Sequence, residues 1–337
     1  MVTIGDVARH LGVSRSTVSY ALTGKRPVSE LTKHRVADAI AELDFVPSTR
    51  ARALAGARSR TLAALAPMGP DAAPPIALQF INGTAQASRR RDHDLLLVVG
   101  DEAVHGIDRL LRSDRADGLI LFDVTEDDPR LAKAARSQKP TVMIGCPTDE
   151  APIDSVDLDW QAAGTLMVEH LTRHGHRSIG LLGAQPAAYA RHLAYAERFR
   201  AGARGAAERA GAHLHEWPAT PHLAATAASL RALFEAHPDT TALAIQQESI
   251  VPHIRPLLAG LGLRIPHDIS VVGMGLDALA SETVAPISGV DNPSATLTAT
   301  AVDLLIDRIE ARDPAREPRR VLIPPHFDDR ATTAAVT

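Results

Sequence analysis

The hydrophobic residues of this chain follow two different patterns, one in the first 46 residues and another from residue 61 onward. In the later part, short and almost wholly apolar runs alternate with longer amphipathic stretches. A run of about seven apolar residues predicts a strand buried on both faces, which is typical of a parallel sheet. The expected strands lie at residues 61–67, 94–100, 117–124, 140–146, 178–184, 241–246 and 269–275.

The stretches between these runs are long enough to be helices. A helical crossover between parallel strands needs roughly a dozen residues or more. A wider gap, residues 146–178, follows the fourth predicted strand. The pattern therefore predicts an α/β core with two doubly wound, parallel-sheet lobes.

The first 46 residues show the spacing of short helices instead. A first apolar stripe ends at Gly12, Ser14 can cap a second helix over residues 15–22, and Ser29 can cap a third. Pro47 stops this unit, and the basic, alanine-rich stretch after it is either a short helix or a flexible linker. The apolar positions of the three helices are Ile4, Val7, Ala8, Leu11, Val18, Leu22, Val36, Ile40 and Leu43.

Charge separates the same two parts of the chain. The net charge of the 337 residues is −4, which alone argues against a nucleic-acid binder. Residues 1–60, however, hold 10 Lys and Arg against 5 Asp and Glu, a balance of +5, so the remainder carries −9. A basic head on an acidic body indicates a module that binds a polyanion.

The single cysteine, Cys146, excludes an internal disulfide and fits a reducing compartment. The first residues do not form a charged and then apolar leader, and no apolar run reaches the roughly 18 residues that span a bilayer. We therefore expect a cytoplasmic protein. The sequence offers no clear nucleophile, metal-ligand or phosphate-loop motif, so we expect no cofactor, no metal and no enzymatic activity.

Two helices joined by a short turn with glycine form the helix-turn-helix pattern, whose second helix enters the major groove of DNA. Arg15 and Ser16 lie at the start of the second predicted helix, where base edges are met. Thr17, Ser19 and Tyr20 follow on or beside the same face. The alternative on the pattern alone is an ordinary helical hairpin on a protein surface.

The head resembles that of the lactose-repressor and galactose-repressor (LacI-type) transcription regulators. The shared elements are "DVARHLGVSRSTVSYAL", then "VSELTKHRVADAIAEL", and a proline before "ARALAG". The similarity continues in "HLTRHGHRSIGLLGA", "DISVVGMG" and "RRVLIPPHFDDRATT", so it covers essentially the whole chain.

This resemblance implies an all-α helix-turn-helix domain at residues 1–46, a hinge helix or linker at 47–60, and an effector-binding and dimerisation core at 61–337. The core is similar to periplasmic sugar-binding proteins. Its expected N-lobe is about 61–157 with 289–316, and its expected C-lobe about 158–288 with 317–332.

The resemblance also implies the function. The expected protein is a sequence-specific regulator, with repression as the expected direction, that binds a pseudopalindromic operator in double-stranded DNA as a homodimer. A small-molecule effector between the lobes changes its operator affinity. The alternative is a constitutive DNA-binding protein whose core only dimerises.

DNA contacts are expected from the head and from the hinge. A leucine of each hinge helix wedges into the minor groove in family members, and Leu54 matches it, with Ala51 on the same face. Tyr20 departs from a common arginine, which leaves the operator sequence at that position open. The expected contact residues are Thr3, Ser14, Arg15, Ser16, Thr17, Ser19, Tyr20, Lys25, Arg50, Ala51 and Leu54.

The effector site departs from the family pattern. Cys146 replaces a frequent Asp, Gln246 and Gln247 replace Asn-Asp, and Gly275 replaces another Asp. The loss of these carboxylates disfavours an ordinary monosaccharide and favours a less hydroxylated ligand or none. The expected effector-facing residues are Cys146, Asp159, Arg198, Gln246 and Gly275, with Asp157 and Asp159 in the segment that borders the cleft.

Three histidines, His170, His174 and His176, lie close together in the sequence. They could hold a metal, but a helix C-terminus capped by Gly175 explains them as well, since a histidine there interacts favourably with the helix dipole. We favour the helix terminus.

Overall fold

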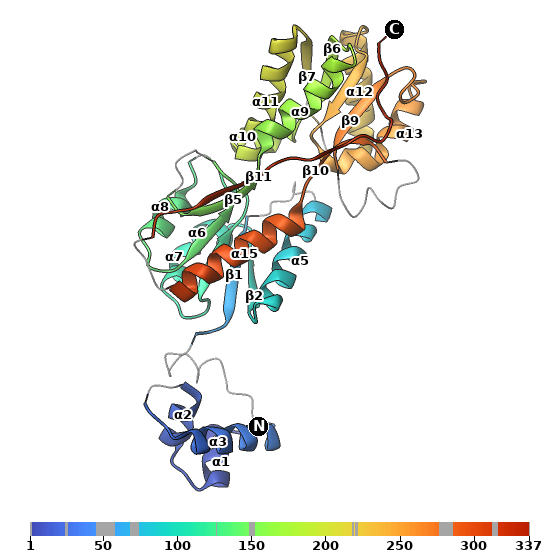
Figure 1. The fold of residues 1–337 in the computed structure, drawn as a ribbon. Helices are drawn as coiled ribbons and strands as arrows, with labels where there is room; N and C mark the ends of the chain where they lie inside the picture. The colour runs from blue at the N-terminus through green and yellow to red at the C-terminus, as the bar shows by residue number, and fades with distance from the viewer. Residues whose placement is uncertain are drawn as a thin grey trace.

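The computed structural model describes residues 2–23, 26–44, 58–67, 74–125, 127–147, 152–217, 219, 222–275, 286–311 and 316–336. It contains a helical head and two α/β lobes (Figure 1). The predicted fold class is confirmed. Among the described residues, no helix combines the length and the apolar composition needed to cross a bilayer.

The head consists of helices α1 (Ile4–Leu11), α2 (Arg15–Thr23) and α3 (Glu30–Glu42). Gly12 ends α1 in the left-handed region, at φ 67°, where glycine carries no steric penalty. Ser14 and Ser29 cap α2 and α3 as expected, because each hydroxyl accepts a hydrogen bond from a backbone N–H of the first turn. The small core of the head is made by Val7, Ala8, Val18, Val36 and Ala39.

The N-lobe contains a six-stranded sheet with the order β11-β5-β4-β3-β1-β2, in which all neighbours are parallel. Its strands are β1 (Thr61–Ala66), β2 (Asp94–Val99), β3 (Gly118–Leu121), β4 (Thr141–Ile144), β5 (Asp154–Leu158) and β11 (Arg320–Ile323). Alternate residues of β1 explain why the run is apolar throughout: Leu62 and Leu65 belong to hydrophobic clusters on opposite faces.

Helices cover both faces of this sheet. One cluster contains residues of α5 (Pro74–Arg90) and α15 (Ser294–Ala311), and the other contains residues of α6 (Glu102–His105), α7 (Ile107–Leu111) and α8 (Pro129–Ala135). This is the doubly wound arrangement.

The C-lobe repeats the plan with a sheet of order β12-β10-β9-β8-β6-β7, in which the pair β10–β12 is antiparallel and the other pairs are parallel. Its strands are β6 (Ser178–Leu182), β7 (His213–Trp217), β8 (Ala242–Ile245), β9 (Ser270–Gly275), β10 (Ser288–Asp291) and β12 (Phe327–Asp328). The helical segments are α9 (Trp160–Arg173), α10 (Pro186–Ala190), α11 (Ala194–Ala210), α12 (Leu223–Ala236), the 3₁₀ segment Glu248–His253 and α13 (Ile254–Ala259).

The chain crosses between the lobes after β5, after β10 and after β11 (Figure 1). These positions differ from the expected lobe boundaries at residues 289 and 317. β10 pairs with β9 and therefore belongs to the C-lobe, whereas β11 pairs with β5 and belongs to the N-lobe. Both strands are only four residues long, and the partner of β11, the strand β5, is distant in sequence.

Helices α9 and α11 approach closely because each has a glycine at the contact. A Cβ on Gly164 would lie 2.2 Å from the carbonyl oxygen of Phe199, and a Cβ on Gly202 would lie 2.0 Å from that of Gln161. Neither backbone can retreat without moving a helix.

We therefore expect Gly202→Ala to lower the free energy of unfolding by roughly 1–3 kcal/mol, the usual range for overpacking. Gly205→Ala on the same helix is the matched control. Its Cβ would meet only the end of the Arg209 side chain, so helix propensity should make it neutral or stabilising. Urea unfolding of the two variants measures the difference, and equal stabilities would contradict the tight contact.

The histidines of "EHLTRHGHR" attach the C-terminal segment to the C-lobe. His170 Nε2 lies 2.9 Å from Thr333 Oγ1, and its ring stacks on Phe327 at 4.3 Å between centroids. His176 bridges Thr241 Oγ1 and the carbonyl oxygen of Ala334. The favoured interpretation, a helix terminus, matches the position of His174, which follows α9.

Burial, followed by the charge of His174, lowers the pKa of His170 to about 4. Between pH 6.5 and pH 4, the imidazole of His170 is protonated in the unfolded chain but remains neutral in the folded protein. Stability from this group is therefore complete above pH 6.5 and declines as the pH falls toward 4, by roughly 2–3 kcal/mol.

We expect His170→Gln to flatten this part of the pH profile of unfolding, measured by urea titration between pH 7 and pH 4.5. The exposed His253→Gln is the control and should leave the wild-type slope unchanged. Parallel profiles for wild type and His170→Gln would exclude His170 as the source.

Candidate DNA-binding head and interlobe cavity

Helix α2 presents a polar first turn on the surface of the head. Ser14 Oγ lies 2.8 Å from both Ser16 Oγ and Thr17 Oγ1 and accepts a hydrogen bond from the Thr17 N–H at 3.0 Å. Val18, one residue later, is fully buried and anchors the helix. The exposed Arg15 and Ser16 thus lie on a helical turn that the Ser14 cap fixes before them and the buried Val18 fixes after them.

Arg15 reaches back over α1. A Cβ on Gly5 would lie 2.9 Å from the Arg15 guanidinium, so this glycine leaves room for the side chain. Ser19 and Tyr20 are half-buried, and the guanidinium of Arg26 lies 5.5 Å from the centre of the Tyr20 ring. The predicted contact residues Arg15 to Tyr20 therefore cluster on one helix beside a further cation.

Thr3 has a structural role that the sequence did not indicate. Its N–H and its hydroxyl both donate to Asp6 Oδ2, at 2.9 and 2.7 Å, and so fix the start of α1. The predicted contact residues Lys25, Arg50, Ala51 and Leu54 lie outside the described residues.

A cavity of about 570 Å³ lies between the two lobes. It is placed at the carboxyl ends of the parallel strands, since its lining includes Ala66, Phe122 and Ile144 of the N-lobe and Ala184 and Gln246 of the C-lobe. Open α/β sheets bind ligands at this edge.

Aromatic side chains form much of the apolar wall. Phe80 and Phe122 meet edge to face with ring centres 6.2 Å apart, and Trp160 lies 5.5 Å from Tyr195. All four line the cavity.

Asp157, at the end of β5, is buried beneath this wall. Its carboxylate accepts hydrogen bonds from Trp160 Nε1 at 2.8 Å and from the N–H groups of Cys146 and Leu158, each at 2.9 Å. Burial raises the pKa of Asp157 to about 6, and these three hydrogen bonds oppose the rise. Its hydrogen-bonding capacity is thus used mainly within the protein.

Gln246 connects three parts of the C-lobe. Its Oε1 accepts from the Ala184 N–H at 3.1 Å and from the Tyr189 hydroxyl at 3.2 Å, and its Nε2 donates to the carbonyl oxygen of Tyr195 at 3.3 Å. The side chain therefore holds the ends of β6 and β8 and the start of α11 together at the cavity wall.

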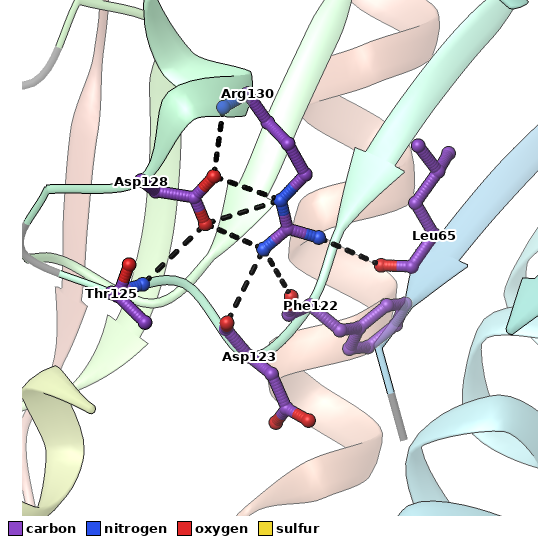
Figure 2. A network of polar contacts seen from close by, with 6 residues as sticks. All are labelled: Leu65, Phe122, Asp123, Thr125, Asp128 and Arg130. Carbon is purple, nitrogen blue, oxygen red and sulfur yellow. Dashed lines mark hydrogen bonds and ion pairs between the residues drawn. The ribbon is translucent and has the colours of Figure 1, made fainter. Parts of the chain in front are cut away.

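A buried ion pair fixes the N-lobe side of the cavity (Figure 2). Arg130 Nε and Nη2 donate to the Asp128 carboxylate at 2.9 and 2.6 Å, and the side chain of Arg130 is 1% exposed. Its remaining donors reach the carbonyl oxygens at the ends of two neighbouring strands, those of Leu65, Phe122 and Asp123.

Asp123 itself has an unusual backbone, at φ 50°, which a non-glycine residue adopts only when its surroundings impose it. Its carboxylate points away from Arg130 in Figure 2, and it lines the cavity. Burial raises the pKa of Asp123, opposed by the charges of Arg191 and Arg130.

The comparisons with known proteins agree with this arrangement. Residues 3–48 match the sequence profile of bacterial regulatory proteins of the lacI family, and residues 168–333 match that of the periplasmic binding protein-like domain. Together the two matches cover more than half of the chain. The chain belongs to the lacI family of bacterial regulatory proteins. It is a DNA-binding transcriptional regulator, and its family is one of regulators rather than enzymes.

Relatives of this lacI-family chain match it along nearly its whole length. The HTH-type transcriptional repressor PurR of Aliivibrio fischeri (strain MJ11) is 27% identical over 326 residues, 94% of each chain. The HTH-type transcriptional regulator CelR of Thermobifida fusca is 28% identical over 96% of each chain.

Solved structures share the fold. The lac repressor dimer bound to operator and the anti-inducer ONPF superposes with a TM-score of 0.81 at 25% identity and 99% coverage of both chains. A complex of the regulator CelR with cellobiose gives a TM-score of 0.68 at 24% identity, covering 98% of this chain and all of the other.

Among the effector-facing residues predicted for this lacI-family chain, Gln246 lines the cavity, as does Asp157. The other four do not belong to the described lining. Asp159 instead caps α9 by accepting from the Ala162 N–H at 2.9 Å. Arg198 influences the cavity through its charge, which lowers the pKa of Asp157.

Cys146 and Gly275 are not among the residues that line the cavity. Cys146 is fully buried, with its thiol 3.4 Å from Ser155 Oγ, and burial raises its pKa, so it is not an activated nucleophile. A side chain on Gly275 would meet Asp291 Oδ1 at 2.4 Å.

The cavity is more acidic than the sequence predicted. The predicted losses of carboxylates concern the ends of β4, β8 and β9, whereas three of the four lining carboxylates, all but the predicted Asp157, come from other positions. Asp123 lies two residues after the end of β3, and Glu248, three residues after the end of β8, begins the 3₁₀ segment. The signal was therefore their place shortly after an apolar run. The acidic lining residues are Asp101, Asp123, Asp157 and Glu248.

Proposed function

We propose that this regulator represses transcription by binding a pseudopalindromic operator as a homodimer, and that a small molecule in the interlobe cavity changes its operator affinity. The polar first turn of α2 carries this proposal. The proposed site of action is the cytoplasm, where the chromosome is accessible.

Each of the three parts of the chain would have its own role. Residues 1–46 would bind DNA, with base contacts from Arg15 and Ser16 and further contacts from Thr17, Ser19 and Tyr20. Residues 47–60 would form the hinge, with Leu54 as the minor-groove wedge, and residues 61–337 the core. A bidentate arginine–guanine contact and an apolar wedge at a base step are both common devices in DNA recognition.

An exposed apolar surface on the N-lobe supports the homodimer. β2 is the edge strand of its sheet, and its Leu97 and Val99 are 39% and 47% exposed. Leu78 of the neighbouring α5 is 62% exposed. An apolar edge of this kind favours association and is stabilised when a partner covers it. The similarity to the lac repressor dimer on operator DNA points the same way.

The arrangement of the cavity between two lobes supports a coupling between ligand binding and operator affinity. Thr125 of the N-lobe and Leu193 of the C-lobe form an antiparallel bridge, and Leu193 also lines the cavity. A ligand that contacts both lobes binds their open and closed arrangements with different affinities. Such a difference is what shifts an equilibrium, typically with 1–3 kcal/mol of coupling. This favours a ligand-responsive regulator over a core that only dimerises.

The DNA contact can be tested on an operator selected from a random duplex library. We expect Arg15→Ala to weaken binding to that operator about 10- to 100-fold, since a base contact contributes about 1–3 kcal/mol, and to relax specificity at one position per half-site. Quantitative gel shift on the operator and on a random duplex measures both effects.

The charge-matched control is Arg264→Ala in the C-lobe, an exposed arginine paired with Asp268, which should not change operator affinity. If Arg15→Ala weakens operator and random duplex equally, Arg15 binds phosphate and the assigned base contact is wrong. If no duplex is enriched by selection, sequence-specific binding itself is excluded.

We also expect Leu97→Lys to weaken the dimer by about tenfold or more, because each copy would place a charged group at the proposed interface in place of a leucine that the partner covers. Sedimentation equilibrium at micromolar concentration measures the change. Gln138→Lys, an exposed position beyond α8 on the other face of the sheet, is the control. A dimer unaffected by Leu97→Lys would place the interface elsewhere.

A further inference from the structure

The cavity contains more negative than positive charge. Four carboxylates line it, whereas Arg191 is the one basic residue among its described lining. Arg191 is exposed to solvent and forms no ion pair with a described carboxylate, and its charge opposes only in part the effect of burial on the pKa of Asp123. The imbalance favours a ligand that donates hydrogen bonds or carries positive charge.

Two of these carboxylates, Asp123 and Glu248, line the cavity from opposite lobes. The charges of Asp123 in the N-lobe and Glu248 in the C-lobe both contribute to raising the pKa of Tyr195, after burial, which is the main cause. Both groups therefore lie near the Tyr195 phenol, beside the aromatic wall of Trp160.

Asp123 is the carboxylate that the protein leaves available. Asp157 accepts three hydrogen bonds, but the carboxylate of Asp123 accepts none from the described residues. In Figure 2, Arg130 donates to the backbone carbonyl oxygen of Asp123 and not to its carboxylate. A desolvated carboxylate without a partner is destabilising, and its retention in a strained backbone indicates a binding role.

Asn292 gives an independent indication of a ligand. Its Nδ2 donates to Glu248 Oε1 at 2.8 Å, which leaves its Oδ1 as a hydrogen-bond acceptor. Asn292 lines the cavity and is only 6% exposed, and its Oδ1 is buried with no hydrogen-bond partner among the described residues. Buried acceptors of this kind are normally satisfied, so a donor from a ligand is expected there.

We propose that the effector is an organic cation, whose protonated amine lies between Asp123 and Glu248 and donates to Asn292 Oδ1, and whose apolar part packs on Phe80, Phe122 and Trp160. This inference rests on the proposed function and names the class of its ligand. Because the two carboxylates belong to different lobes, their repulsion opposes closure of the cavity, and a cation between them removes it. The cation would thus favour the closed arrangement.

Matched ligands test the charge class by thermal shift of the full-length protein. One set is 2-phenylethylamine, 2-phenylethanol and phenylacetate, and a second is glucosamine, glucose and glucose 6-phosphate. We expect the amine of at least one set to raise Tm by roughly 2 °C or more and by more than its neutral and anionic counterparts. Asp123→Asn and Glu248→Gln should abolish this preference, and Asp127→Asn, exposed in the same loop, should keep it.

Two results would overturn the proposal: a neutral or anionic member that stabilises as strongly as the amine, or no stabilisation by either amine. Operator binding, measured in parallel, separates this failure from that of the proposed function. If the protein binds the operator but shows no preference for amines, the proposed regulatory function is retained and only the proposed ligand class is wrong.

A measurement without ligand keeps the test independent of the probes. Asparagine tolerates the left-handed backbone of position 123 and removes the unpaired charge, so Asp123→Asn should raise Tm of the free protein. Asp127→Asn should leave Tm unchanged. A lower Tm for Asp123→Asn would show that this carboxylate stabilises the fold, which contradicts a role reserved for a ligand.

Discussion

Parallel pairing of strands is the constraint on which the rest of this molecule depends. In each lobe, the carboxyl ends of the parallel strands meet at one edge of the sheet, and both such edges line the same cavity. Residues far apart in sequence, such as Asp123 and Glu248, are brought near one side chain only by this rule. Because the chain passes between the lobes after β5, β10 and β11, neither lobe is a continuous segment.

Buried ion pairs hold the ends of this arrangement in place. Arg130 and Asp128 are almost fully buried, and Arg130 uses its other donors on strand-end carbonyl oxygens. Asp154 similarly accepts from Arg308 and so joins β5 to α15. Burial of charge is expensive, and such pairs are tolerated when every donor is satisfied. Their value here is to specify the shape of the cavity wall rather than to add much stability.

The two candidate sites make different demands on the chain. The head needs only a short helix with a fixed first turn, which Ser14 and the buried Val18 supply locally. The cavity needs polar groups that remain without partners until a ligand arrives, and these can be kept only by a core that is stable for other reasons. The close approach of α9 and α11 at Gly164 and Gly202 is one such reason. A DNA-binding head and a cavity of this kind joined in one chain are what a ligand-responsive regulator requires.

The sequence by itself determined the helix-turn-helix head, the predicted strands, the two-lobe α/β class and the family. The head, the strands and the two-lobe class follow from local signals: a serine cap, a glycine at the end of α1, and apolar runs long enough to be buried on both faces. The family follows from the resemblance of longer motifs along the chain. The sequence also predicted Gln246 as a residue of the cleft, because that residue directly follows an apolar run, and Gln246 lines the cavity. The strands β5, β7, β10, β11 and β12 were not predicted, since they are short or polar and are defined by their neighbours in the sheet. Only the tertiary structure decided that Cys146 and Gly275 do not line the cavity and that Asp123 and Glu248 do. The direction of a side chain at a strand end depends on backbone conformation and on contacts with the other lobe, and neither is encoded in a local stretch of residues.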